Sequence, residues 1–135
     1  MTLFQILGLY VALLLIINMV LMVRVFRIRQ SKRVSLGDGD DPLLHSRIRA
    51  HANFSETVPI ALFGLFSLAM LGAPVWALHL VGAGTVIGRI SHAIGMAGPH
   101  SVGKARPFGI VLFLATSLFT ALYILGYLLG FWLAG

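Results

Sequence analysis

The hydrophobic positions of this chain fall into long, almost uncharged stretches separated by short polar connections. Residues 3–23 contain no charge, and about 21 residues at 1.5 Å each cross a hydrocarbon core roughly 30 Å thick. Three further apolar stretches follow, so the pattern predicts four helices at residues 3–30, 42–72, 74–97 and 107–133. We therefore expect an all-α integral membrane protein, a four-transmembrane-helix bundle in a single domain over residues 1–135.

The connections between these stretches carry turn and helix-start signals. Asp41 can cap free N–H groups, and Pro42 is tolerated at a first helical position, so the second helix should begin there. Gly72-Ala73-Pro74 predicts a tight turn between the second and third helices, and Pro107 is placed to begin the fourth. The first stretch has no preceding Lys or Arg and no small-residue cleavage site, so it reads as a retained helix and not as a signal peptide.

Composition narrows the class of protein further. Hydrophobic residues make up 59% of the chain and charged residues only 10%, whereas a soluble domain carries about 25% charged residues. So little polar surface excludes a soluble domain, and so much hydrophobicity excludes disorder. The chain has no cysteine, which excludes disulfides, thiolate metal sites and a cysteine nucleophile of its own.

The charge is basic, with ten Lys and Arg against four Asp and Glu and a formal charge of +6. If the helices alternate in direction, the basic residues near their ends gather at one membrane face. The positive-inside rule makes that face cytoplasmic and puts both termini outside, with Trp76 and Trp132 at the opposite interface. Of these cations, Arg24, Arg27, Lys32 and Arg33 are expected to set the topology and meet lipid headgroups, and nucleic acid is not expected as a partner. The basic residues that gather at this face are Arg24, Arg27, Arg29, Lys32, Arg33, Arg47, Arg49, Lys104 and Arg106.

Three polar residues share one face of the second predicted helix. Arg49, Asn53 and Glu56 are spaced i, i+4, i+7. An ionised Glu56 within the membrane should face the bundle interior and pair with a cation, and Arg89 and His92 on the third helix are the candidate partners. The face could bind a ligand, or it could be an ion-paired stripe that joins the helices.

The candidate chemistry follows from the residue types. The histidines lack the spacing of a metal set, no nucleophile motif is present, and we expect no metal site. Guanidinium groups could bind the carboxylates of a small zwitterionic anion while Glu56 meets its ammonium group. The apolar side could admit a lipophilic co-substrate. A nearby arginine could favour the thiolate of a thiol that arrives with the ligand.

Two segments carry a resemblance to a known family. The segment RIRAHANFSETVP at residues 47–59 and the segment GRISH at residues 88–92 resemble the motifs of the MAPEG family, membrane-associated proteins in eicosanoid and glutathione metabolism. The chain is most similar to the small bacterial branch. The resemblance implies a homotrimer in the bacterial inner membrane, with glutathione as co-substrate bound between subunits near the cytoplasmic face.

The resemblance also implies roles for individual residues. Arg106 would correspond to the arginine that activates the thiol. At two positions where some members have tyrosines that contact glutathione, this chain has Thr57 and Met96, which makes eicosanoid synthesis an improbable activity. The glutathione contacts would be Arg29, Arg49, Asn53, Glu56, Arg89 and His92.

Three functions remain open from the sequence. The first is an enzyme, a membrane glutathione-dependent transferase or peroxidase acting on lipophilic electrophiles. The second is a small four-helix transporter, although such proteins carry their membrane glutamate in the first span and here Glu56 stands among arginines. The third is a non-catalytic lipid-binding or scaffold protein.

Overall fold

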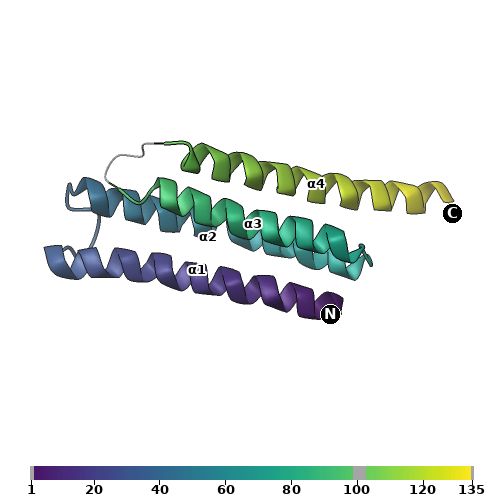
Figure 1. The fold of residues 1–135 in the computed structure, drawn as a ribbon, viewed down its shortest axis with the longest axis horizontal. Coiled ribbons are helices and arrows are strands. Elements are labelled where there is room, and N and C mark those ends of the chain that lie inside the picture. The colour runs from purple at the N-terminus through teal and green to yellow at the C-terminus, as the bar shows by residue number, and fades with distance from the viewer. Residues whose placement is uncertain (1, 99–102, 135) are drawn as a thin grey trace.

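The structure is a computed structural model that describes residues 2–98 and 103–134. Four α-helices make up the fold: α1 (Leu3–Lys32), α2 (Pro42–Met70), α3 (Val75–Gly95) and α4 (Ala105–Ala134). They lie along one long axis and alternate in direction (Figure 1). The observed bounds differ from the predicted ones by no more than two residues at each end.

The helix starts show how local sequence sets these bounds. The Asp41 side chain accepts a hydrogen bond from the backbone N–H of Leu44 at 2.8 Å, which confirms the predicted cap of α2. By contrast, α4 begins at Ala105, two residues before the predicted start at Pro107. A proline is tolerated in this first turn because the N–H groups there have no intrahelical acceptor.

Length and composition support three of the four predicted membrane spans. Helices α1, α2 and α4 are each long and apolar enough to cross a membrane. Helix α3 is not among these candidate spans in the described part of the chain, because it contains two histidines, an arginine and several glycines. It nevertheless lies alongside the other helices over most of its length (Figure 1).

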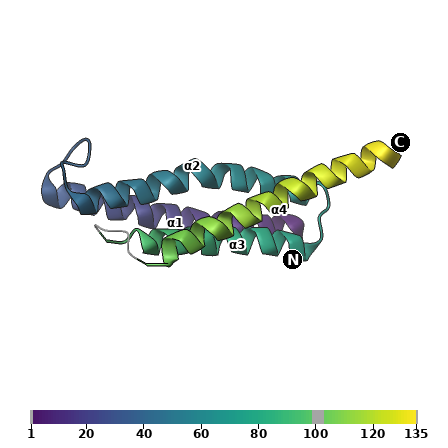
Figure 2. The same cartoon turned by 90° about the horizontal axis from the view of Figure 1, so that it is seen from above.

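The ends of the bundle differ in charge. The end of α1, the start of α2, the end of α3 and the start of α4 lie at one end, where the described basic segments gather, and α1 starts and α4 finishes at the other (Figure 1). Trp76 and Trp132 lie near that second end and are 60% and 85% exposed. In Figure 2 the C-terminal part of α4 diverges from the other helices. We call the end with the basic segments the basic end.

Two apolar clusters fill the interior. One joins α1, α2 and α3 away from the basic end and includes Ile6, Leu68 and Leu78, which are almost fully buried. The other lies nearer the basic end and includes Leu21 and Phe54. Burial of these side chains fixes the angular position of each helix, and hence which polar residues face one another.

Helices α3 and α4 approach closely along a seam of glycines. A Cβ atom added at Gly109 would lie 2.5 Å from the carbonyl oxygen of Gly88 and 2.6 Å from the backbone N of His92, so only glycine fits there. Small residues at this spacing, as in Gly84-x-x-x-Gly88, allow two helices to approach closely. The second such pair, Gly126 and Gly130, has no atom within 4 Å of its added Cβ positions in the described chain.

Candidate functional site

A polar cavity of about 330 Å³ opens at the basic end, between the first turns of α2 and α4 and the last turns of α3. Four of the residues predicted for the site line it together: Arg49, Asn53, His92 and Arg106. We call this cavity the polar pocket. Its lining consists of Pro42, His45, Ser46, Arg49, Asn53, His92, Met96 and Arg106.

The wall from α2 and the wall from α3 meet through a hydrogen bond. Ser46 is buried, and its hydroxyl donates to the carbonyl oxygen of Met96 at 3.0 Å. His92 is also buried, at 4% exposure, whereas Arg49 on the α2 wall is exposed. The pocket therefore has a fixed inner side on α3 and a more open rim on α2.

Arg89 lies behind the pocket and holds one of its lining residues. Its Nη1 donates to Asn53 Oδ1 at 2.7 Å and to Thr57 Oγ1 at 3.0 Å, and its Nη2 donates to the carbonyl oxygen of Gly109 at 3.4 Å. The guanidinium also lies 4.2 Å from the ring centroid of Phe113, a cation–π contact. Arg89 thus joins α2, α3 and α4 and leaves the amide nitrogen of Asn53 for another acceptor.

The expected interior position of Glu56 is wrong for the single subunit. Its side chain is exposed, and among the described residues neither Arg89 nor His92 forms an ion pair with it. The physical reason is the rotation of α2: positions seven apart share a face, so Glu56 follows Arg49 to the outside. Of Arg49, Asn53 and Glu56, only Asn53, at the edge of that face, forms a hydrogen bond with α3. Arg89 therefore bonds neutral oxygens and not a carboxylate.

Arg29, predicted as a further contact, lies away from the polar pocket. Its Nη1 donates to the carbonyl oxygens of Val34 and Ser35 at 3.5 and 3.4 Å, just beyond the end of α1. These bonds satisfy carbonyl groups after a helix C-terminus, where a cation is also favoured by the helix dipole. In one subunit, therefore, Arg29 stabilises the end of α1.

Sequence reasoning missed a histidine–aspartate pair at the rim of the polar pocket. His45 lines the pocket, and its Nδ1 lies 2.6 Å from Asp38 Oδ2 in the preceding loop. Gly37 and Gly39 have positive φ angles of 66° and 58°, which let the loop fold Asp38 back towards α2. The hydrogen bond from His45 holds the pKa of the Asp38 carboxyl below its usual value. The only sequence signal was the seven-residue spacing across a glycine-rich turn.

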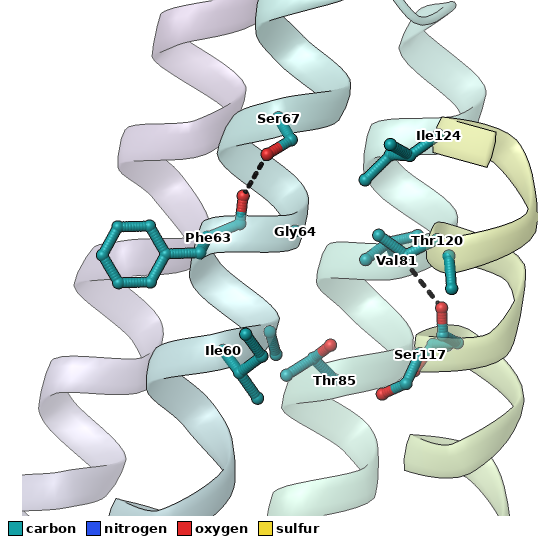
Figure 3. Close-up of a pocket in the computed structure, with 12 residues that line it drawn as sticks. Ile60, Phe63, Gly64, Ser67, Val81, Thr85, Ser117, Thr120 and Ile124 are labelled. Atoms are coloured by element: carbon teal, nitrogen blue, oxygen red, sulfur yellow. Dashed lines mark hydrogen bonds between the residues drawn. The ribbon is translucent and has the colours of Figure 1, made fainter. Parts of the chain in front are cut away.

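Two of the other cavities are large and apolar. One of about 320 Å³ lies between α2, α3 and α4 in the middle of the bundle, and Figure 3 shows its residues, with Phe63 turned away from it. The hydroxyls of Ser67 and Thr120 bond carbonyl groups of their own helices at 2.9 and 2.8 Å, and no charged residue lines the cavity. The other, of about 470 Å³, is lined by α1 and α2 around Pro59. Neither lining could bind an anion.

No metal site is found in the part of the chain that the structure describes. There, no group of three or more His, Asp or Glu side chains lies close enough to hold an ion. His100, one of the five histidines in the sequence, lies outside the described residues.

Comparison with known proteins places the chain in a family. Residues 7–130 match the MAPEG family. Among curated proteins, the inner membrane protein YecN of Escherichia coli K12 is 36% identical over 88 residues, which cover 65% of this chain and 67% of that protein. YecN of Escherichia coli O6:H1, strain CFT073, matches to the same extent. No solved structure matches. The match covers all four helices and the polar pocket, and the chain therefore belongs to the MAPEG family.

Proposed function

We propose that this protein is a glutathione-dependent transferase or peroxidase of the bacterial inner membrane that acts on lipophilic electrophiles. The observation that carries the proposal is the polar pocket, which gathers Arg49, Asn53, His92 and Arg106 from three helices at the basic end. Membership of a family that includes glutathione transferases and peroxidases supports it.

The chemistry of the pocket suits a ligand with carboxylates and a thiol. Its two guanidinium groups, from Arg49 and Arg106, can each form two parallel hydrogen bonds to a carboxylate. No Asp or Glu is among its lining residues in the described chain, and the carboxylate of Asp38 at its rim is bonded to His45. Arg106 is the proposed partner of the thiolate, since a nearby cation favours the charged form of a thiol.

The outer face of α2 supports a homotrimer in which neighbouring subunits complete the site. Arg49 and Glu56 are both exposed on this face, and a second copy packed against it would cover them. An ionised Glu56 is costly within a membrane unless it is paired, and the ammonium group of glutathione would supply the partner. Arg29 of a neighbouring copy would be the further cation.

The proposed placement in the membrane follows from the charges at the two ends. The basic end would face the cytoplasm and both termini would lie outside. Helix α3 would be the fourth span, shielded from lipid by its partners, which agrees with the burial of Arg89 and His92. The curated relative YecN is described as an inner membrane protein, in agreement with this location.

Calorimetric titration of the detergent-solubilised protein with glutathione tests the proposal. A parallel titration uses the analogue that lacks the thiol. We expect both to bind, and we expect Arg49→Ala and Glu56→Ala each to weaken binding by about 10–100-fold, the loss of one charge-assisted hydrogen bond. Lys104→Ala removes an exposed cation from the same end outside the pocket and should bind as the unchanged protein does. Absence of glutathione binding to the unchanged protein would refute the proposal.

A further inference from the structure

The histidine–aspartate pair at the rim of the polar pocket has the geometry of an oriented proton acceptor. The contact of 2.6 Å between His45 Nδ1 and Asp38 Oδ2 is short, as expected for a charge-assisted hydrogen bond. When Nδ1 donates its hydrogen to the carboxylate, the neutral ring is held in the tautomer with a lone pair on Nε2. Nε2 has no hydrogen-bond partner among the described residues.

The loop holds two further carboxylates, Asp40 and Asp41, and neither bonds His45 among the described residues. Asp41 accepts from the backbone N–H of Leu44 and pairs with Lys32 at 3.2 Å. Its oxygens are therefore committed to the start of α2 and to the end of α1. Asp38 is the carboxylate that contacts His45.

The groups around His45 differ in whether they can take a proton from a bound thiol. Asp38 bonds His45 from the loop, and the lining of the polar pocket adds Arg49 from α2, His92 from α3 and Arg106 from α4. A guanidinium group has N–H donors and no acceptor, so Arg49 and Arg106 can stabilise a thiolate but cannot accept its proton. His92 is buried at 4% exposure, whereas the His45 side chain is 62% exposed and can pass a proton to water.

We infer that His45 is the general base that takes the thiol proton of glutathione in the polar pocket, and that Asp38 is the residue that positions it. The inference rests on the proposed function. It adds His45 as the proton acceptor, because an arginine cannot accept the thiol proton. The supporting observation is that one cavity brings His45 together with Arg49 and Arg106.

The proposed step balances for an aryl chloride such as chlorodinitrobenzene. The S–H bond of glutathione breaks and its proton forms an N–H bond at His45 Nε2. The thiolate electron pair forms a carbon–sulfur bond to the ring, and chloride leaves with the electron pair of the carbon–chlorine bond. The imidazolium, held by Asp38, then releases the proton to water, so the net products are the thioether, chloride and a proton.

The test measures kcat/KM for glutathione with chlorodinitrobenzene from pH 6 to pH 10, in the full chain and in variants. General base catalysis is worth on the order of 10²-fold, so we expect His45→Gln to lose about that factor at pH 7. The loss should shrink above about pH 8.5, where a free thiol ionises without help. Asp38→Asn should lower kcat/KM by a smaller factor than His45→Gln does. The double variant should lower kcat/KM no more than His45→Gln alone, because Asp38 acts through His45.

A matched control and a rescue separate catalysis from folding. His51 lies on the same helix and bonds Asn18 Oδ1 at 3.1 Å through its Nε2, outside the polar pocket, so His51→Gln should leave the pH profile unchanged. In His45→Ala, added imidazole should restore part of the rate at pH 7, which a merely structural role would not allow.

The outcomes distinguish this inference from the proposed function. If the unchanged protein binds no glutathione, the proposed function fails and this inference fails with it. If it binds and conjugates glutathione but His45→Gln keeps the same rate and pH profile, only the inference is overturned. A loss in His45→Gln that is equal at every pH and is not rescued by imidazole in His45→Ala also overturns it.

Discussion

The glycine seam between α3 and α4 allows a quantitative prediction for Gly109→Ala. The added methyl group would lie 2.5 Å from the Gly88 carbonyl oxygen and 2.6 Å from the His92 backbone N, where ordinary contacts are 3.4–4 Å. Because both obstacles are backbone atoms, the helices must separate by about 1 Å, which forfeits a quarter to a half of the dispersion energy across that contact. Overpacking of this kind costs about 1–3 kcal/mol, offset by about 0.5–1 kcal/mol from the better helix propensity of alanine.

The difference between these two effects spans about 0–2.5 kcal/mol, so the expected loss in the free energy of unfolding is centred near about 1 kcal/mol. Gly126→Ala is the matched control, since the same change on the same helix meets no atom within 4 Å, and it should leave stability unchanged or slightly higher. The assay is unfolding in mixed detergent micelles followed by circular dichroism. Equal stability of the two variants would refute the reasoning that backbone contact, and not helix propensity, decides the effect of alanine in this seam.

Three further predictions concern single contacts. Tyr10→Phe removes the hydrogen bond of 2.8 Å to His79 Nδ1 and should lower the free energy of unfolding by about 0.5–1.5 kcal/mol in the same assay. In Arg89→Lys the side chain cannot keep the branched contacts to both α2 and α4, so the free energy of unfolding should fall by about 1.5–3 kcal/mol. Calorimetry should show weakened glutathione binding in this variant. Unchanged stability would contradict the role of these contacts. The backbone N–H of Leu44 lowers the pKa of Asp41. A carboxylate whose pKa is lowered by folding stabilises the protein above its unfolded pKa, and this stabilisation is lost as pH falls through the folded-state pKa. The difference in melting temperature between the unchanged protein and Asp41→Ala should therefore be largest at neutral pH and should begin to shrink once pH falls below about 4.

Local sequence was enough to predict the four helices and much of the polar pocket. The cap at Asp41 and the proline after it mark a helix start through chemistry that acts within one turn, so the structure reproduces it. The face of α2 that carries Arg49 and Asn53, and the placing of Arg106 at the start of α4, follow from helical spacing and alternating direction.

Partners across helices could not be predicted in the same way. Spacing shows that Glu56 shares a face with Arg49 but not which neighbour that face meets, because burial of apolar residues elsewhere sets the rotation of α2. The expectation of charge pairing predicted the Glu56 carboxylate as the partner of Arg89. The hydrogen bonds of Arg89 go instead to the neutral oxygens of Asn53, Thr57 and Gly109. The contact between Asp38 and His45 depends on the path of the loop, which no helical period describes.

The glycine seam also divides the polar pocket into two mechanical parts. Helices α3 and α4 touch backbone to backbone at Gly88 and Gly109, so we expect the wall with His92 and Arg106 to move as one rigid piece. The α2 wall is joined to that piece near the pocket by side-chain hydrogen bonds, notably those from Ser46 and Arg89. Local opening takes the route with the fewest contacts to break, so the rim of α2 is the side that would swing to admit and release a ligand.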